Sequence, residues 1–292
     1  MSASLSAGAA RLVSAPRGGL PDWCDRFLAP PGAGDFFASR AWYDTILAHA
    51  LPTAAEPLLA VCGEAMMLPL LRHGGRLCSL TTPYSLVWRP LPAPGADAAA
   101  LRLAGRGFGG LLRCCPPVRL EALDAAAPGL AAVLEGFAEV RGLHLHRYRH
   151  FGNWHEVLAP GLDWEGYLAA RPPALRTTIG RKLARCRREM VFEAVTTPGA
   201  SLESGIAAYE DVRSRSWKPF EPHLAFDGAL MRAAAAVGAL RLGVLRARAD
   251  GRPAAAQYWV VAGGRAMLLK LAHAEDQRAA SPGTALTALM IR

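Results

Sequence analysis

The chain has 292 residues, of which 52% are hydrophobic and 20% charged, and its formal net charge is +9. This composition is typical of a globular protein and excludes a disordered one, and the length allows one large domain or two ordinary ones. No apolar run is long enough to predict a membrane-spanning helix. Only three of the 33 basic residues are Lys. A basic surface attracts polyanions such as CoA, nucleotides, RNA or anionic lipid.

The first half predicts a helix followed by three short strands. Ser39 is the expected N-cap of the helix. The strands are expected over 57–62, 65–71 and 76–80, with turns at Gly63-Glu64 and Gly74-Gly75. Residues 1–21 contain Arg11, Arg17, several Ser and no acid, a composition that resembles a transit peptide weakly. An unstructured, Ala-rich N-terminus without a secretory signal is the favoured interpretation.

Further strands are predicted over 118–123 and 143–151, with a helix at 129–141 between them. His144, His146 and His150 would share one face of the second strand. Metal binding is not expected there, because no carboxylate or thiol lies on that face and Arg residues surround it. The glycine-rich stretch Gly105-x-Gly107-x-Gly109-Gly110 lacks the context of a phosphate loop and is interpreted as a flexible turn.

The second half repeats this order of elements. Helices are predicted at 163–170, 173–190, 202–218 and 227–237. They precede strands at 240–247, 253–262 and 265–273, separated by turns at Asp250-Gly251 and Gly263-Gly264. Helices followed by an antiparallel meander thus occur twice. This repetition predicts an α+β fold of two related units, residues 1–160 and 161–292, with a boundary near Pro160-Gly161.

The segment 276–284, which we call the cradle, lies where the last strand meets a helix predicted to begin at about Thr284. A helix start exposes unpaired backbone N–H groups and the positive end of the helix dipole. Pro282 and Gly283 shape the turn, and Gly283 lets a ligand approach the backbone closely. Arg278 adds a positive charge. The cradle therefore predicts a site for a diphosphate beside a strand edge.

The pattern Arg278-x-x-Ser281-x-Gly283 resembles the acyl-CoA loop of the GNAT superfamily, Gln/Arg-x-x-Gly-x-Gly/Ala. Ser281 replaces the first Gly, and this Ser-Pro-Gly form resembles the FemAB-like branch, including CelD/BcsL-type acetyltransferases of bacterial envelope and polysaccharide gene sets. Other stretches of the second half resemble that branch in the same order, and the first half resembles it loosely. They are Leu162-Asp-Trp-Glu-Gly-Tyr-Leu168, the basic run 176–188, Arg215-Ser-Trp217 and Lys270-Leu-Ala-His273.

The resemblance implies two tandem GNAT-like units and an acyl-CoA co-substrate, such as acetyl-CoA, but no metal. The donor would bind at the cradle helix start, on Arg278, Ser281, Gly283, Thr284 and Ala285. Its pantetheine arm would lie along the strand 265–273. A small-molecule or envelope-precursor acceptor would enter between the units, and the first unit would support it without binding donor. At least one more strand follows the last helix in this fold, so the second unit is expected to lack its last strand or strands.

Several residues are candidates for the chemistry. Acyl transfer to an amine needs a base, and His273 or Glu275 at the strand end could serve. Tyr209 and Trp217, eight residues apart on a predicted helix, would line an acceptor pocket or else lie in the core. Arg181 and Arg185, with Arg188 on the same helical face, would hold phosphates or else form a solvated face.

Two other functions remain open at this stage. Relatives in the peptidoglycan branch use aminoacyl-tRNA as the donor, and the basic helix would then contact tRNA. A non-catalytic protein of envelope polysaccharide assembly is the other alternative. The six cysteines show no Cys-x-x-Cys and no disulfide spacing. Reduced thiols, and hence a cytoplasmic location, are expected.

Overall fold

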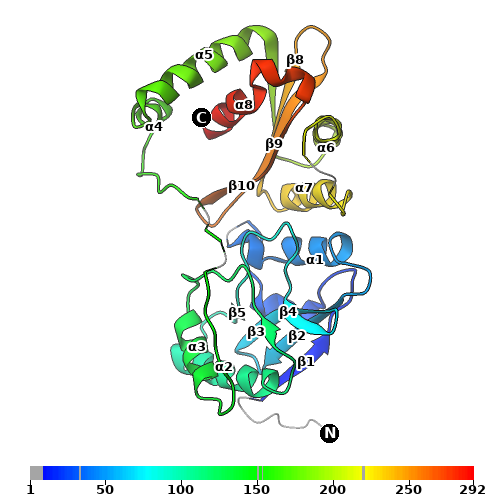
Figure 1. Cartoon of the computed structure of the whole chain (residues 1–292), viewed down its shortest axis with the longest axis vertical. Helices are drawn as coiled ribbons and strands as arrows, with labels where there is room; N and C mark the ends of the chain where they lie inside the picture. Colours follow the sequence, from blue (N-terminus) through cyan, green and yellow to red (C-terminus); the bar gives the residue numbers. More distant parts are fainter. Residues whose placement is uncertain (1–8, 33, 150, 153, 219–220) are drawn as a thin grey trace. The chain divides into compact units, whose positions relative to one another are not determined.

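The structure is a computed structural model that describes residues 9–32, 34–149, 151–152, 154–218 and 221–292. The chain divides into two compact units, Met1–Asn153 and Trp154–Arg292 (Figure 1). Each unit combines a mainly antiparallel sheet with helices, which confirms the predicted α+β class. No helix in the described part of the chain is long and apolar enough to span a membrane.

The sheet of the first unit is built around the predicted meander. Its strands pair in the order β1-β2-β3-β4-β6, and β5 pairs with β3. The bounds are β1 Ala10–Ser14, β2 Glu56–Cys62, β3 Met66–His73, β4 Arg76–Ser79, β5 Leu91–Pro92 and β6 Val118–Arg119. Gly63 and Gly74 turn the meander with φ of +52° and +56°, in the left-handed region that favours glycine.

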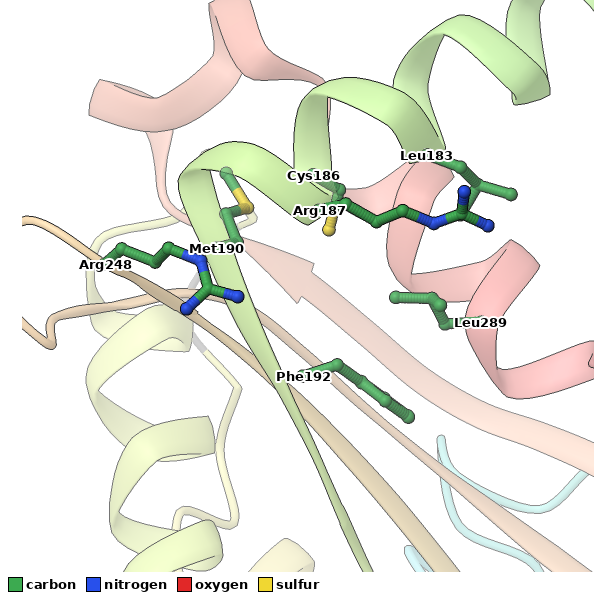
Figure 2. A pocket seen from close by; sticks show the side chains of 7 residues that line it. All are labelled: Leu183, Cys186, Arg187, Met190, Phe192, Arg248 and Leu289. Atoms are coloured by element: carbon green, nitrogen blue, oxygen red, sulfur yellow. The ribbon is translucent and has the colours of Figure 1, made fainter.

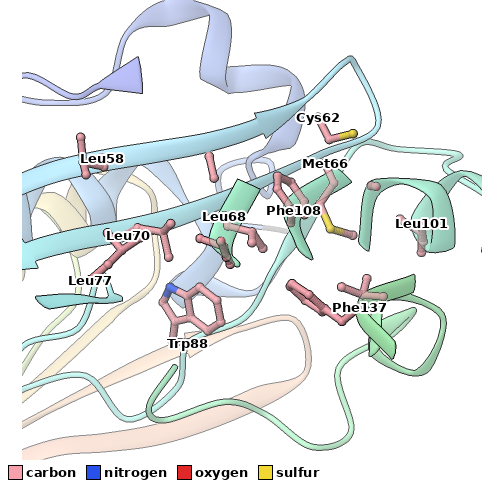
Figure 3. Close-up of a cluster of buried hydrophobic side chains, with 14 residues drawn as sticks. Leu58, Cys62, Met66, Leu68, Leu70, Leu77, Trp88, Leu101, Phe108 and Phe137 are labelled. Atoms are coloured by element: carbon pink, nitrogen blue, oxygen red, sulfur yellow. The ribbon is translucent and has the colours of Figure 1, made fainter. Parts of the chain in front are cut away.

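Helical segments cover this sheet. They are η1 Asp22–Phe27, η2 Phe36–Ala38, α1 Arg40–His49, α2 Ala98–Leu112 and α3 Leu130–Ala138. Ser39 caps α1 as predicted, and its hydroxyl accepts from the Trp42 backbone N–H at 3.3 Å. Residues of α2 and α3 pack with the strands around the buried Trp88 (Figure 3).

Two predictions for the ends of this unit are wrong. Residues 10–14, expected to be unstructured, form β1 and pair antiparallel with β2. The predicted strand 143–151 does not form, because residues 144–149 have no regular structure. His150 lies outside the described residues. The predicted strand 118–123 is reduced to β6, which has two residues.

The interpretation of the glycine-rich stretch as a turn is also wrong, since it lies inside α2. A Cβ on Gly105 would lie 2.2 Å from the Val133 carbonyl oxygen of α3. A Cβ on Gly136 of α3 would lie 2.0 Å from the Arg102 oxygen of α2. The glycines therefore serve the close approach of two helix backbones.

The second unit has one sheet with helices on both faces. Its strands pair antiparallel in the order β10-β9-β8-β7. Helices α5 and α8 cover one face, and α6 and α7 cover the other (Figure 1). The strands are β7 Met190–Val195, β8 Leu240–Ala247, β9 Pro253–Ala262 and β10 Arg265–His273. The helices are α4 Trp164–Ala169, α5 Pro173–Glu189, α6 Ala200–Ser214, α7 Phe226–Ala236, η3 Glu275–Ala280 and α8 Pro282–Ile291.

The bounds of β8, β9 and β10 agree with the predicted strands, and all four helices before them form. Strand β7 was not predicted. Helix α6 ends at Ser214, short of the predicted 218. Helix α8 begins at Pro282, before the predicted Thr284, since Pro suits a first helical position.

Candidate functional site

Strand β10 forms one edge of the second sheet and leads into the cradle. It has a bulge between Leu268 and Lys270. Bulges bend a strand, leave backbone groups unpaired and often lie next to active sites. Among the described residues no strand pairs with the outer edge of β10. The edge can therefore offer backbone donors and acceptors to a ligand.

The cradle turns sharply at Ser281, which has φ +52° and ψ +52°. A side chain in this left-handed conformation costs roughly 1–2 kcal/mol, and glycine avoids that cost. This cost explains why the GNAT-like pattern has glycine at this position. Ser281 adopts the same left-handed conformation although it has a side chain. The Ser281 side chain makes no capping hydrogen bond to α8. The first N–H groups of α8 therefore remain available to an anion.

Helix α5 places basic side chains against the cradle. The Lys182 Nζ donates to the Ser281 Oγ at 2.7 Å, and Arg185 donates to the Ala279 carbonyl at 3.1 Å. Arg185 also pairs with Glu189 at 2.6 Å. Arg181 is exposed and makes no ion pair with any residue that the structure describes. The structure thus brings Arg185 to the cradle and shows Lys182 there, which the sequence analysis had not singled out.

Gly283 has no left-handed φ, and a Cβ there would meet the His273 Nδ1 and a Leu271 methyl carbon at 3.8 Å. These are ordinary contacts, so the protein's own fold does not require glycine at this position. A glycine here leaves the space beside the start of α8 unfilled by a side chain. The same distances show that the His273 imidazole lies beside the start of α8.

Arg278 and Glu275 belong to η3, and both face solvent. The Arg278 side chain is 78% exposed and its guanidinium lies 3.1 Å from the Glu275 carboxylate. An exposed pair of this kind is worth little, so a ligand phosphate can displace Glu275 at low cost. Thr284 is exposed, whereas Ala285 is buried and its backbone N–H donates to the Ser281 carbonyl oxygen at 3.5 Å.

Tyr209 and Trp217 do not share a helical face as predicted. Tyr209 is 1% exposed in the core, whereas Trp217 lies beyond the end of α6 and is 68% exposed. The spacing argument fails because the helix ends three residues before Trp217. Of the two residues, only Trp217 has an exposed ring.

A buried polar cluster, which sequence reasoning missed, lies where α6, α7, β9 and β10 pack. We call it the Asp227 cluster; its members are Tyr209, Glu221, Asp227, Tyr258 and Lys270. The Asp227 carboxylate is 2% exposed and accepts from the Tyr258 hydroxyl at 2.6 Å and the Tyr209 hydroxyl at 3.0 Å. Lys270 lies 3.2 Å from Asp227 and also pairs with Glu221.

The electrostatics of the Asp227 cluster hold both tyrosines neutral. Burial raises the pKa of the Tyr258 hydroxyl well above its usual value, and the Asp227 charge raises it further. Burial and Asp227 likewise raise the pKa of Tyr209. A buried carboxylate needs such donors, and only the tertiary fold assembles them. Asp227 near the start of a predicted helix was the available signal, but it is also an ordinary helix N-terminal residue.

Helix α5 borders a hollow of about 330 Å³ on the face of the sheet that α5 and α8 cover (Figure 2). Its lining is mostly apolar and is flanked by Arg187 of α5 and Arg248 of the β8–β9 turn; the other lining residues are Leu183, Cys186, Met190, Phe192 and Leu289. In the described part of the chain, neither guanidinium makes an ion pair. Burial raises the pKa of the Cys186 thiol, and the two arginines lower it in part. The hollow is thus a second positively charged feature of α5.

Comparison with known protein families finds a match in the second unit. Residues 173–292 match the family of acetyltransferase (GNAT) domains. GNAT domains bind acyl-CoA, and this match spans every element from α5 to α8. Among the described residues, no group of three or more His, Cys, Asp or Glu could hold a metal ion.

Two solved structures are similar to most of the chain at low identity. One is a tandem GNAT protein from the clavulanic acid biosynthesis pathway, 14% identical with a TM-score of 0.40, covering 97% of this chain and 84% of that one. The other is the C-terminal domain of a putative lysylphosphatidylglycerol synthetase from Agrobacterium fabrum. It is 12% identical with a TM-score of 0.41, and the match covers 78% of this chain and 64% of that one. No curated protein matches the sequence.

Proposed function

We propose that this protein is an acyltransferase of the FemAB-like GNAT type, which moves an acyl group from acyl-CoA to an amine or hydroxyl acceptor. The observation that carries the proposal is the meeting of three features at the end of β10. They are the open N-terminus of α8, the left-handed turn at Ser281, and the cations of α5 and η3. A diphosphate with a pantetheine arm fits a helix start that adjoins a free strand edge.

Each cradle residue has a role in this proposal. The backbone N–H groups of Gly283 and Thr284 bind the diphosphate oxygens, while Pro282 has no N–H to offer and the Ala285 N–H donates to the Ser281 carbonyl oxygen at 3.5 Å. Arg278 leaves Glu275 to pair with a phosphate, and Arg181 and Arg185 add positive charge from α5. Lys182 holds the Ser281 side chain at 2.7 Å and so fixes the turn.

The chemistry is direct transfer. The acceptor nitrogen attacks the thioester carbonyl carbon, the carbon–sulfur bond breaks, and the CoA thiol leaves with a proton. His273 is favoured over Glu275 as the base, because its ring lies beside Gly283 and Glu275 is engaged with Arg278. An outward backbone N–H of β10 would polarise the thioester oxygen. Trp217 would contact the acceptor, for which a small molecule or an envelope precursor of polysaccharide synthesis is the proposed class.

Calorimetric titration with acetyl-CoA tests the proposal. We expect saturable binding that desulfo-CoA reproduces and that 3′,5′-ADP reproduces only weakly, because the latter lacks the diphosphate and the pantetheine arm. Equal binding of all three compounds, or of none, would contradict the cradle assignment. Transfer itself is measured as free thiol released in the presence of candidate amines.

The basic surface of α5 favours a second candidate, an aminoacyl-tRNA-dependent transferase of the FemAB type. Arg181, Arg187 and Arg248 have no acidic partner among the described residues. Unpaired arginines are the usual means of neutralising nucleic-acid phosphates. If tRNA is the donor, it should bind more tightly than acetyl-CoA. Its affinity should then fall steeply with salt, and replacing these three residues with Gln should flatten that dependence.

A further inference from the structure

Lys218 occupies the outer edge of β10. Its Nζ donates to the Leu271 carbonyl oxygen. Lys218 lies just beyond the end of α6, in the segment that leads to α7. The side chain therefore reaches back over the strand that ends at the cradle.

The direction of the Leu271 carbonyl follows from the ladder. The N–H and C=O of one residue in an antiparallel strand point to the same edge, and this edge alternates along the chain. Ala274 points inward, because its N–H donates to the Ala254 carbonyl of β9 at 2.9 Å. Leu271 is three residues earlier without an intervening bulge, so it points outward. The Lys218 amine thus lies on the edge along which the acyl donor would bind.

The surroundings of Lys218 lower its pKa and so increase the share of neutral amine at a given pH. Partial burial lowers the pKa of Lys218, and the Lys270 charge lowers it further, while Glu221 and Asp227 offset part of this effect. Glu221 and Asp227 are both engaged with Lys270. A neutral amine is the nucleophile in acyl transfer, and desolvation increases its share at a given pH.

We propose that Lys218 is a self-acylation site of this protein, and this inference rests on the proposed acyl-CoA donor. The Lys218 nitrogen forms an amide bond to the thioester carbonyl carbon, the carbon–sulfur bond breaks, and CoA leaves as the thiol. The proton lost by the amine balances the proton gained by the thiolate. No oxidant or further reactant is needed. Acylation removes the positive charge that faces the β10 edge.

The chain supplies its own controls, since it has only two other lysines. Lys182 lies at the cradle and donates to Ser281 at 2.7 Å. Lys270 pairs with the Glu221 and Asp227 carboxylates. Neither control side chain donates to an outward carbonyl of the β10 edge, as Lys218 does.

The test incubates the full chain with acetyl-CoA and follows acetylation of each lysine by peptide mass spectrometry. We expect Lys218 to be acetylated at least about tenfold faster than Lys182 or Lys270, because the bound thioester and the amine are held together. Arg278→Ala should slow this reaction in proportion to its weaker donor binding. Lys218→Arg, which keeps the positive charge, should abolish the fast phase. Acetyl-N-hydroxysuccinimide, a donor that needs no cradle, should still favour Lys218 over the other two lysines.

Three results count against the inference, and they are distinguishable. If calorimetry shows that acetyl-CoA binds and Lys218 is acetylated no faster than the other lysines, the inference fails while the proposed function stands. If acetyl-CoA does not bind, both fail. Equal reaction of all three lysines with acetyl-N-hydroxysuccinimide would remove the reactivity argument for Lys218 in either case.

Discussion

Truncating Asp227 should destabilise the second unit strongly, because this side chain satisfies three donors. Asp227→Ala leaves the hydroxyls of Tyr209 and Tyr258 without their acceptor, and both residues are 1% exposed. Each buried donor that is left without an acceptor costs roughly 1–3 kcal/mol. Lys270 keeps Glu221 as a partner and adds little to this sum.

The two hydroxyls left without an acceptor should together lower the free energy of unfolding by roughly 2–6 kcal/mol, with about 4 kcal/mol as the central value. A domain is typically stable by about 5–15 kcal/mol, so the variant should remain partly folded. With a urea slope of about 2 kcal/mol/M, the unfolding midpoint should move down by about 2 M. Hydrogen exchange of the β9 and β10 amides during the urea titration reports on this unit specifically.

A second variant separates the loss of acceptors from a mere cavity. Combining Asp227→Leu with Tyr209→Phe and Tyr258→Phe removes donors and acceptor together, and should cost less than Asp227→Leu alone. Asp250→Ala, in an exposed turn, is the matched control and should change little. An Asp227→Ala loss below about 1 kcal/mol, or a triple variant that is no better than Asp227→Leu, would refute the reasoning.

Three further predictions concern the cradle, the α2–α3 contact and alkaline stability. Arg278→Ala should weaken acetyl-CoA binding about tenfold or more, and Gly283→Val should block it by filling the ligand's space. Calorimetric titration measures both effects, and thermal melts should show unchanged melting temperatures. Gly105→Ala should lower the urea stability of the first unit by roughly 1–3 kcal/mol, whereas Gly110→Ala, with open space around its Cβ, should leave it unchanged or raise it by up to about 1 kcal/mol. The free energy of unfolding should fall as the pH rises above 10.0, because the pKa of Tyr258 is raised in the folded state. Above that pH the unfolded chain loses a proton that the folded chain retains. A urea midpoint that stays flat from pH 9 to about 11 would count against this.

The sequence predicted the elements whose signals are local. The meander β8–β9–β10 agrees with its predicted bounds, because alternating apolar residues and glycine turns act within a few residues of one another. The Ser39 cap is local in the same way. The strand-to-helix junction at the cradle was also predicted, and the family match to residues 173–292 supports the GNAT resemblance that its motif suggested.

Other features depended on partners far away in the chain. The alternating pattern at 143–151 forms no strand over 144–149, where no strand among the described residues pairs with it. Residues 10–14 form β1 because they pair with the edge of β2. Gly105 is tolerated inside a helix because α3 packs so closely against it that a Cβ would not fit.

The Asp227 cluster shows most clearly what only tertiary structure decided. Its members come from α6, the segment before α7, α7 itself, β9 and β10, and no spacing in the sequence links them. Whether a Tyr, Asp or Lys is buried depends on whether donors and acceptors from separate elements meet in space. The same holds for Lys218, whose reach to the β10 edge follows from the end of α6 and not from its neighbours in the sequence. Hydrophobic and turn patterns act over a few residues, but the satisfaction of buried polar groups is decided by the whole packed unit.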